Sequence, residues 1–266
     1  MNFVNYFLFI RVTKNSKIDK KNIVEVYVDY RELILLLITA FLPPVIFAIW
    51  IRNTEKYHKE RWRSIFLCFF WGATIAVVAA IILEYVLNFS IIPSIQRQEL
   101  IPLISVVIIA PFAEELTKPL ALTLKTVKRE LSEFEDGLIY GAVAGLGFSA
   151  TENFLYGWSY GLEFLSEGLF FFLVFMAIRS FGGCLLHASA TAWTGYGYGK
   201  AIMRHATILR VVPYLVLAIF VHAFYNFVLS YNLAGATTGL FIALGFTAVS
   251  IQVVRAKIRT LDNKNR

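Results

Sequence analysis

The sequence predicts an all-α, polytopic transmembrane helical bundle of about seven spans, and three observations support this prediction. Hydrophobic residues make up 58% of the 266 residues and charged residues only 16%, a composition far more apolar than that of an ordinary soluble domain. The mean hydropathy is also high, at +0.65. Apolar runs near or above the roughly 20 residues needed to cross a bilayer recur along the chain. We therefore expect several membrane-embedded helices.

The apolar runs begin after residue 30. Residues 1–30 combine a short apolar piece with a lysine-rich segment, so we expect an N-terminal extension outside the core and a membrane-embedded domain over residues 31–266. The fifth run is too long for one straight crossing. The seven candidate spans are residues 31–51, 65–87, 101–124, 137–156, 168–198, 211–230 and 235–254.

Basic residues mark every other connection between these runs. Because lysine and arginine accumulate in cytoplasmic loops, the alternation predicts a multi-pass protein of the cell membrane with a cytoplasmic C terminus and an external N terminus. The net charge of +7 is therefore a topology signal, and nucleic-acid binding is not expected. The basic connections hold Arg52, Lys56, Lys59, Arg61 and Arg63; Lys125, Lys128 and Arg129; Lys200, Arg204 and Arg210; and Arg255, Lys257 and Arg259.

Small residues in the fourth run predict close helix packing. Gly141 and Gly145 are four residues apart, with Gly147 nearby. Glycine at this spacing lets two transmembrane helices approach backbone to backbone.

Three charges lie near the middle of the third run, at Glu114, Glu115 and Lys118. Each charge near the centre of a membrane helix costs roughly 2.5–3.5 kcal/mol on insertion scales, so these side chains need partners, water or a function. Glu114 and Lys118 share one helical face and can pair, whereas Glu115 points about 100° away. An ion-pair staple between helices is the structural alternative to a functional site.

Two prolines flank these charges. Pro111 and Pro119 each remove a helical donor and free the carbonyl four residues earlier, that of Val107 and that of Glu115. Unpaired backbone at membrane depth is tolerated only where protein or a watery cavity satisfies it.

The following runs carry further polar residues. Glu152 lies in the fourth run, Arg179 and His187 in the fifth, and His222 and Asn226 on one face of the sixth. Counted from the cytoplasmic edge, Glu115, His187 and His222 lie about 10 to 12 residues deep and Glu152 about 16, or about 15–24 Å. We expect these side chains to meet in a polar cavity between spans three to six.

Histidine with glutamate suits both zinc coordination and activation of water for attack on a carbonyl. We assign the role of general base to Glu115, or to Glu114 with the pair sharing a proton. His187 and His222 would hold the water, or hold a zinc ion with Glu115 or Glu152 as a third ligand. No motif such as His-Glu-x-x-His places two ligands on one helix, so each ligand must come from a different span.

The remaining residues receive secondary roles. Asn226 would steady the oxyanion, and Glu152 would be a second acid or a metal ligand. Lys118 would be the counter-charge of Glu114. Arg179 would support the site or act as a paired structural residue.

Four motifs in order resemble the PrsW family of intramembrane proteases. They are Glu-Glu-x-x-Lys at 114–118, Phe-x-x-x-Glu at 148–152, the histidine at 187 and His-x-x-x-Asn at 222–226. This family is related to the type II CAAX prenyl endopeptidases and the bacteriocin-immunity (abortive-infection) membrane proteins. The CAAX relatives have a histidine where this chain has Glu152, which favours the PrsW family.

The resemblance covers most of residues 35–255. It implies that residues 31–266 form a protease-like domain that cuts a membrane-anchored protein, such as an anti-sigma factor, with glutamate or metal chemistry. Two other functions stay open. Glutamate and histidine inside helices also mark proton- or ion-coupled transporters, although no inverted repeat is evident. The chain could also be a non-catalytic scaffold or immunity protein.

Overall fold

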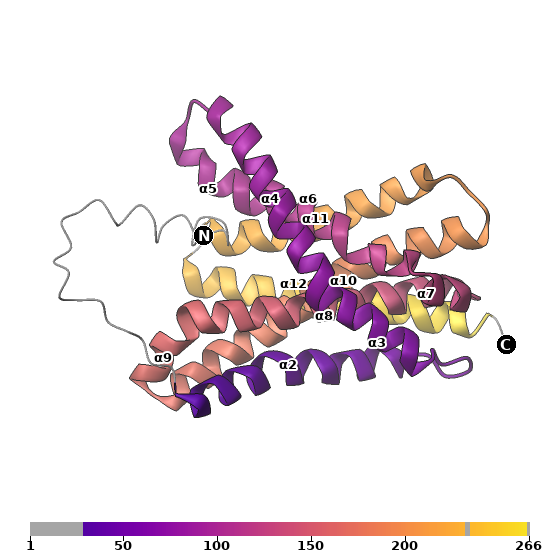
Figure 1. Cartoon of the computed structure of the whole chain (residues 1–266), viewed down its shortest axis with the longest axis horizontal. Helices are drawn as coiled ribbons and strands as arrows, with labels where there is room; N and C mark the ends of the chain where they lie inside the picture. Colours follow the sequence, from indigo (N-terminus) through magenta and orange to yellow (C-terminus); the bar gives the residue numbers. More distant parts are fainter. Residues whose placement is uncertain (1–28, 232–234, 265–266) are drawn as a thin grey trace.

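A computed structural model describes residues 29–231 and 235–264, and every regular element in those residues is helical (Figure 1). The expected N-terminal extension, residues 1–30, lies almost entirely outside the described residues, which begin at residue 29. The first described helix begins at Tyr30. The helices are α2 (Tyr30–Arg52), α3 (Trp62–Trp71), α4 (Val77–Ile91), α5 (Ile101–Ile104), α6 (Ala110–Thr117), α7 (Lys125–Glu130), α8 (Phe134–Tyr156), α9 (Leu162–Glu167), α10 (Leu169–Met203), α11 (Val212–Ser230) and α12 (Ala236–Asp262).

Six segments of the described residues are long and apolar enough to cross a membrane. They coincide with six of the seven predicted runs, which confirms an all-α, multi-pass membrane bundle. The six segments are Tyr30–Arg52, Trp62–Ser94, Gln98–Thr123, Leu169–Met203, Ile208–Ser230 and Ala236–Asp262.

The fourth predicted run, residues 137–156, corresponds to α8, which is not one of these six. α8 is a continuous helix of 23 residues whose glycines and polar side chains lower its hydropathy. Every residue from 135 to 150 is buried, and α8 packs against α2, α3 and α10. A helix enclosed by protein needs no apolar surface toward lipid, so hydropathy alone understates its place in the bundle.

α10 continues without a break for 35 residues. At 1.5 Å per residue it is about 50 Å long, whereas the hydrocarbon core of a bilayer is about 30 Å thick. The predicted run 168–198 is thus longer than one crossing needs, but it contains no proline and does not break. One uninterrupted helix therefore carries both Arg179 and His187.

Close packing of α8 on α10 depends on glycine, as the sequence predicts. A Cβ atom on Gly137, Gly141 or Gly145 would overlap backbone of α10, and at Gly145 the overlap is with the carbonyl of His187. Gly147 has the same relationship to the backbone of α3. Because the backbones are in contact, α8 fixes the position of His187 in the bundle.

The third span is the least regular part of the bundle. It consists of α5, a π-helical segment η5 (Ser105–Ile109), α6 and a 3₁₀ segment η6 (Lys118–Thr123). Pro111 lies at the start of α6 and Pro119 at the start of η6. These positions agree with the predicted interruption of regular α-helix at both prolines.

Side chains of neighbouring helices satisfy carbonyl groups in this span. Asn226 Nδ2 donates to the carbonyl of Val106 at 2.9 Å, and Trp71 Nε1 donates to that of Thr117 at 3.2 Å. The sequence predicts that the carbonyls freed by the prolines are those of Val107 and Glu115. The carbonyls that accept these side-chain hydrogen bonds lie within two residues of them. Protein donors thus compensate for irregular backbone.

The basic connections meet at one end of the bundle, on the right in Figure 1 with the C terminus. Asp262 at the end of α12 accepts a hydrogen bond from the backbone of Lys56 at 2.9 Å. Arg61 pairs with Glu130 of α7 at 3.1 Å. This geometry fits the alternating basic connections, while the side of the membrane that this end faces and residence in the cell membrane stay predictions.

Candidate active site

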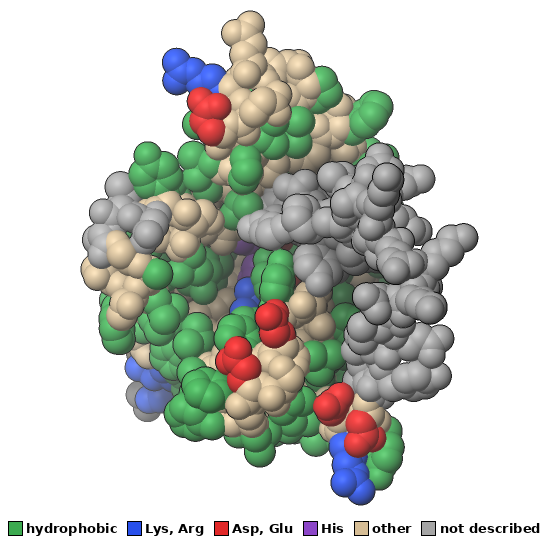
Figure 2. Space-filling model, turned by 90° about the vertical axis from the view of Figure 1, so that its left-hand side faces the viewer, with side chains coloured by type: hydrophobic (Ala, Val, Ile, Leu, Met, Phe, Trp, Pro, Cys, Tyr) green, Lys and Arg blue, Asp and Glu red, His purple; other side chains and the backbone are tan. Residues whose placement is uncertain are grey.

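A cavity of about 230 Å³ lies where α4, α6, α8, α10 and α11 converge. Figure 2 faces the end of the molecule away from the C terminus, and it shows a histidine and a basic side chain deep in a hollow framed by hydrophobic side chains. The predicted cavity between spans three to six is present, and α4 of the second span adds a wall. Its polar lining includes Glu114, Glu152, Arg179, His187, His222 and Asn226.

Glu115 is enclosed and is not part of the cavity wall, although it is adjacent to Glu114 in sequence. Its exposed fraction is 0%. Oε1 accepts hydrogen bonds from Lys118 Nζ at 2.8 Å and from His222 Nδ1 at 2.9 Å. Oε2 accepts one from Thr191 Oγ1 at 2.8 Å. Both oxygens therefore join α6 to α10 and α11.

The bond to Glu115 orients the His222 ring. Because Nδ1–H donates to a carboxylate, Nε2 of the neutral ring keeps its lone pair. Nε2 lies 3.9 Å from Oε2 of Glu114. A carboxylate on one ring nitrogen and a lone pair on the other is the usual arrangement of a metal-binding histidine.

His187 shows the same arrangement from another helix. Its Nε2 lies 2.8 Å from Oε2 of Glu152, and Arg179 Nη2 contacts the same oxygen at 3.0 Å. Its Nδ1 lies 3.8 Å from Oε2 of Glu114. Donation from Nε2–H to Glu152 leaves the Nδ1 lone pair to accept a hydrogen bond from Lys118 Nζ at 2.8 Å, beside Glu114.

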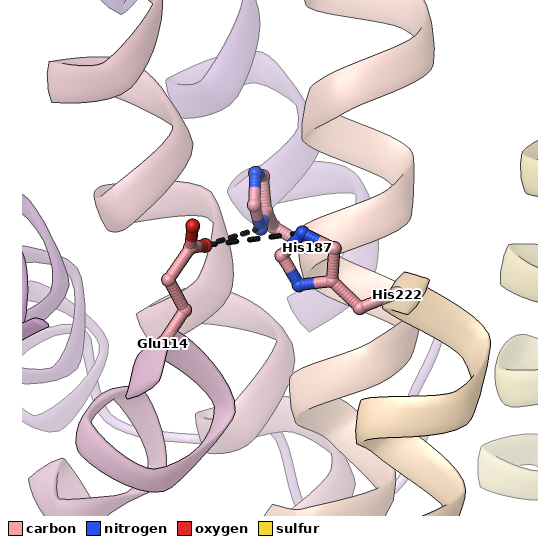
Figure 3. Close-up of side chains that lie close together, drawn as sticks. All are labelled: Glu114, His187 and His222. Atoms are coloured by element: carbon pink, nitrogen blue, oxygen red, sulfur yellow. Dashed lines mark ion pairs between the residues drawn. The ribbon is translucent and has the colours of Figure 1, made fainter. Parts of the chain in front are cut away.

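Glu114, His187 and His222 therefore form one cluster, drawn in Figure 3. One oxygen and two ring nitrogens lie within 4.8 Å of one another. Tetrahedral zinc with bonds of 2.0–2.1 Å places its ligand atoms about 3.3 Å apart, which is about 0.5 Å less than the 3.8 and 3.9 Å between the Glu114 oxygen and the two ring nitrogens. Glu152 and Glu115, the carboxylates considered as third ligand from sequence, lie instead on the other nitrogens of the histidines.

Lys118 places a positive charge beside this cluster. Its Nζ lies 2.9 Å from Oε2 of Glu114, 2.8 Å from Oε1 of Glu115 and 2.8 Å from Nδ1 of His187. Lys118 thus pairs with both glutamates, whereas helical spacing alone points to Glu114. The ammonium group lies at hydrogen-bond distance from two of the three candidate ligand atoms, so a metal ion bound there would have to displace it from them.

Carboxylates outnumber cations around the cavity. Three buried carboxylates and one partly buried carboxylate against two cations leave two negative charges unneutralised when all four are ionised. Burying uncompensated charge is expensive, so a divalent cation fits the local charge balance. The carboxylates are Glu84, Glu114, Glu115 and Glu152, and the cations are Lys118 and Arg179.

Comparison with known proteins identifies the family. The family described as PrsW family intramembrane metalloprotease matches residues 60–254, which include all of these side chains. The chain belongs to the PrsW family. It is 30% identical over 122 residues to Protease PrsW of Clostridioides difficile (strain 630), over 46% of this chain and 50% of that protein. The chain thus spans about half the length of this curated relative, and no solved structure matches it.

Asn226 has a partly structural role in this PrsW-family chain. Its Nδ2 donates to Val106 in the third span, yet the residue also lines the cavity beside His222. One amide hydrogen is engaged by backbone, and the second is available to another acceptor.

Glu84 of α4 is a cavity residue that sequence reasoning missed. It is only 5% exposed and lines the cavity with Glu114 and Glu152. Among the described residues, no hydrogen bond or ion pair to its carboxylate is recorded, in contrast to the other acids of the site. A charge inside the second apolar run was the available signal, since ionisable residues within membrane helices are usually functional.

Proposed function

We propose that this protein is an intramembrane endopeptidase that hydrolyses a peptide bond of a membrane-anchored protein at the cluster of Glu114, His187 and His222. One observation carries the proposal: a ring nitrogen of each of the two histidines lies within 3.9 Å of one oxygen of Glu114, and a carboxylate contacts the far nitrogen of each ring. Family membership favours hydrolysis over ion-coupled transport and over a non-catalytic scaffold.

We assign Glu114, His187 and His222 as the ligands of a zinc ion. Bound zinc would polarise the scissile carbonyl and make its bound water a nucleophile near neutral pH. Glu115 and Glu152 hold the two imidazoles in the required orientation. Such outer carboxylates typically contribute about 10–100-fold to metal affinity or activity.

The proton of the attacking water needs an acceptor on the cavity wall. Glu115 is enclosed, and Oε2 of Glu152 already contacts His187 and Arg179. Glu84 faces the cavity without a recorded partner among the described residues, so it is our assigned acceptor. The free amide hydrogen of Asn226 is positioned on the same wall to steady the oxyanion.

The position and size of the cavity indicate where the substrate is cut and what kind of protein it is. Figure 2 views the hollow from the end opposite the C terminus. With the predicted cytoplasmic C terminus, cleavage falls on the outer side of the membrane. A cavity of about 230 Å³ holds only a short stretch of extended chain, which suits a single-span protein cut beside its membrane helix. An anti-sigma-factor-like protein is the substrate class that the family resemblance suggests.

The test is cleavage by the full chain purified in detergent. A library of single-span substrates, labelled at both ends, is incubated with zinc-loaded protein, and products are located by mass spectrometry. We expect cleavage close to one end of the substrate's membrane helix and its loss in Glu114→Gln. The exposed Glu99 provides a matched control, because Glu99→Gln should cleave normally. Proton uptake by reconstituted vesicles that depends on Glu114, with no cleavage of any substrate, would favour transport instead.

A further inference from the structure

A second group of buried carboxylates lies at the opposite end of α8 from the candidate active site. It combines the 53–61 connection, the start of α8 and the end of α12. Asp136 and Glu152 are 16 residues apart on α8, which corresponds to about 24 Å along the helix. We call it the basal cluster, and its members are Glu55, Glu133, Glu135, Asp136 and Asp262.

The carboxylates of the basal cluster are close enough to share one ion. One oxygen each from Glu55, Glu133 and Asp136 lie within 4.8 Å of one another. The same holds for one oxygen each from Glu55, Glu135 and Asp262. Glu55 belongs to both groups and is the centre of the cluster.

Glu55 provides an independent indication of a missing ligand. Its exposed fraction is 0%, and neither carboxylate oxygen has a hydrogen-bond partner among the described residues. Within residues 29–231 and 235–264, Glu55 forms no salt bridge either. A buried carboxylate with two unsatisfied oxygens, directed at four other acids, is strongly unfavourable unless it is protonated or a cation completes the site.

Ordinary structural roles account for only part of this cluster. Acidic residues in the first turn of α8 interact favourably with the helix dipole, and Asp136 Oδ2 accepts hydrogen bonds from the backbone of Ser132 and Glu133. Asp262 lies at the C-terminal end of α12, where the dipole disfavours an acid. It does accept bonds from the backbone of Lys56 and Tyr57. Neither role explains why Glu55 is buried among them.

The crowding of acids also raises the pKa values of carboxyl groups in and beside the basal cluster. Burial, together with the neighbouring Asp136 and Asp262, raises the pKa of Glu55 to about 8. Burial and Asp136 likewise raise the pKa of Glu60 to about 10. These carboxyl groups resist carrying their full negative charge in the absence of a cation.

We infer that the basal cluster is a binding site for a hard divalent cation, Mg²⁺ or Ca²⁺, which ties the 53–61 connection to α8 and α12. The all-oxygen donor set selects these ions, because zinc prefers nitrogen and sulfur ligands. The site is separate from the zinc ligands proposed above and does not depend on that assignment. Its effect is structural, since it joins three chain segments at the basic end of the bundle.

The test measures thermal unfolding of the full chain in detergent, followed by tryptophan fluorescence. Protein dialysed against a chelator is titrated with MgCl₂ or CaCl₂, with KCl at matched ionic strength as the screening control. We expect a saturable rise in Tm of several degrees with at least one divalent salt, because an ion that binds only the folded state stabilises it. The salt effective at the lower concentration identifies the ion.

Single substitutions test whether the rise in Tm with divalent cations arises at the basal cluster. Glu55→Gln keeps the side-chain volume and removes a repelled charge, so it should fold with an unchanged or higher Tm and lose the cation response. Glu133→Gln, at a partly buried position, should also lose most of the response, and it decides the matter if Glu55→Gln fails to fold. Glu99→Gln and Glu114→Gln should respond like the unsubstituted protein.

Three results would overturn the inference. The first is no rise in Tm beyond that produced by KCl. The second is a response that persists in both Glu55→Gln and Glu133→Gln. The third is a response that Glu114→Gln abolishes, because the ion would then belong to the candidate active site.

Discussion

His222 donates its Nδ1–H to Oε1 of Glu115 at 2.9 Å, and this bond fixes the ring whose Nε2 faces Glu114. The two adjacent glutamates therefore have different surroundings. Successive residues of a helix point about 100° apart, so Glu114 reaches the cavity while Glu115 is enclosed between helices. We expect the two residues to respond differently to the same substitution.

Glu114→Gln should reduce peptidase turnover by about 10²–10⁴-fold or more and abolish zinc binding, because the amide is a poor zinc ligand. Glu115→Gln should be milder, with a loss of about 10–100-fold, since the amide oxygen can still accept from His222. Turnover and bound zinc are measured on the same preparations, with circular dichroism to check folding. Equal zinc content in both variants would contradict this division of roles.

Lys118→Met should destabilise the zinc-free protein by about 3–5 kcal/mol, because it leaves Glu114 and Glu115 buried without their cation. Zinc should then raise the Tm of this variant more than that of the unsubstituted protein, since the ion replaces the missing positive charge. Thermal unfolding with and without zinc checks this. Lys128→Met, which changes an exposed lysine of α7, is the control, and its zinc response should match that of the unsubstituted protein. If zinc fails to stabilise Lys118→Met, the metal is not held near these carboxylates.

Gly145→Ala should lower both stability and activity, because the added methyl group meets the carbonyl of His187. Overpacking of this kind typically costs about 1–3 kcal/mol, and a shift of α10 also displaces a proposed ligand. Gly245→Ala in α12 is the matched control, since nothing lies within 4 Å of its added Cβ. The Tm and turnover of both variants are compared. Two variants with the same Tm would show that α8 and α10 adjust freely at this contact.

Glu84→Gln should reduce turnover by about 10²-fold while zinc binding and folding remain normal, because it removes a proton acceptor and no ligand. Glu99→Gln, which changes an exposed acid at the start of the third span, should have no effect on turnover. Single-turnover cleavage together with zinc analysis checks this. Unchanged turnover in Glu84→Gln would exclude it as the acceptor and leave Glu152 as the alternative.

Much of the candidate site could be predicted from sequence, because charged residues inside apolar runs are conspicuous. Glu152, His187 and His222 lie together as expected, whereas Glu115, expected with them, is enclosed and Glu114 lines the cavity instead. Arg179 pairs with Glu152, as one of its expected roles allowed. Which glutamate faces the cavity could not be predicted, since it depends on how α6 is rotated against α10 and α11. The positions of Glu115 and Glu152 behind the histidines depend on the same packing.

All seven predicted runs correspond to helical segments, but hydropathy alone does not distinguish a helix that faces lipid from one enclosed by protein. Six predicted runs appear as apolar spans, whereas α8 is enclosed by protein and its composition reflects helix contacts. The basal cluster was not foreseen at all. Glu55, Asp136 and Asp262 lie far apart in sequence among ordinary polar residues, and only the meeting of three chain segments makes them a group.

The most direct test of the proposed metal centre is cleavage of a single-span substrate after exhaustive chelation and again after zinc is restored. The protein should lose activity in the chelator and regain it as zinc approaches one ion per chain, while His187→Ala, His222→Ala and Glu114→Gln stay inactive throughout. Activity that survives complete removal of metal, or that persists in any of these variants, would contradict a zinc centre formed by Glu114, His187 and His222.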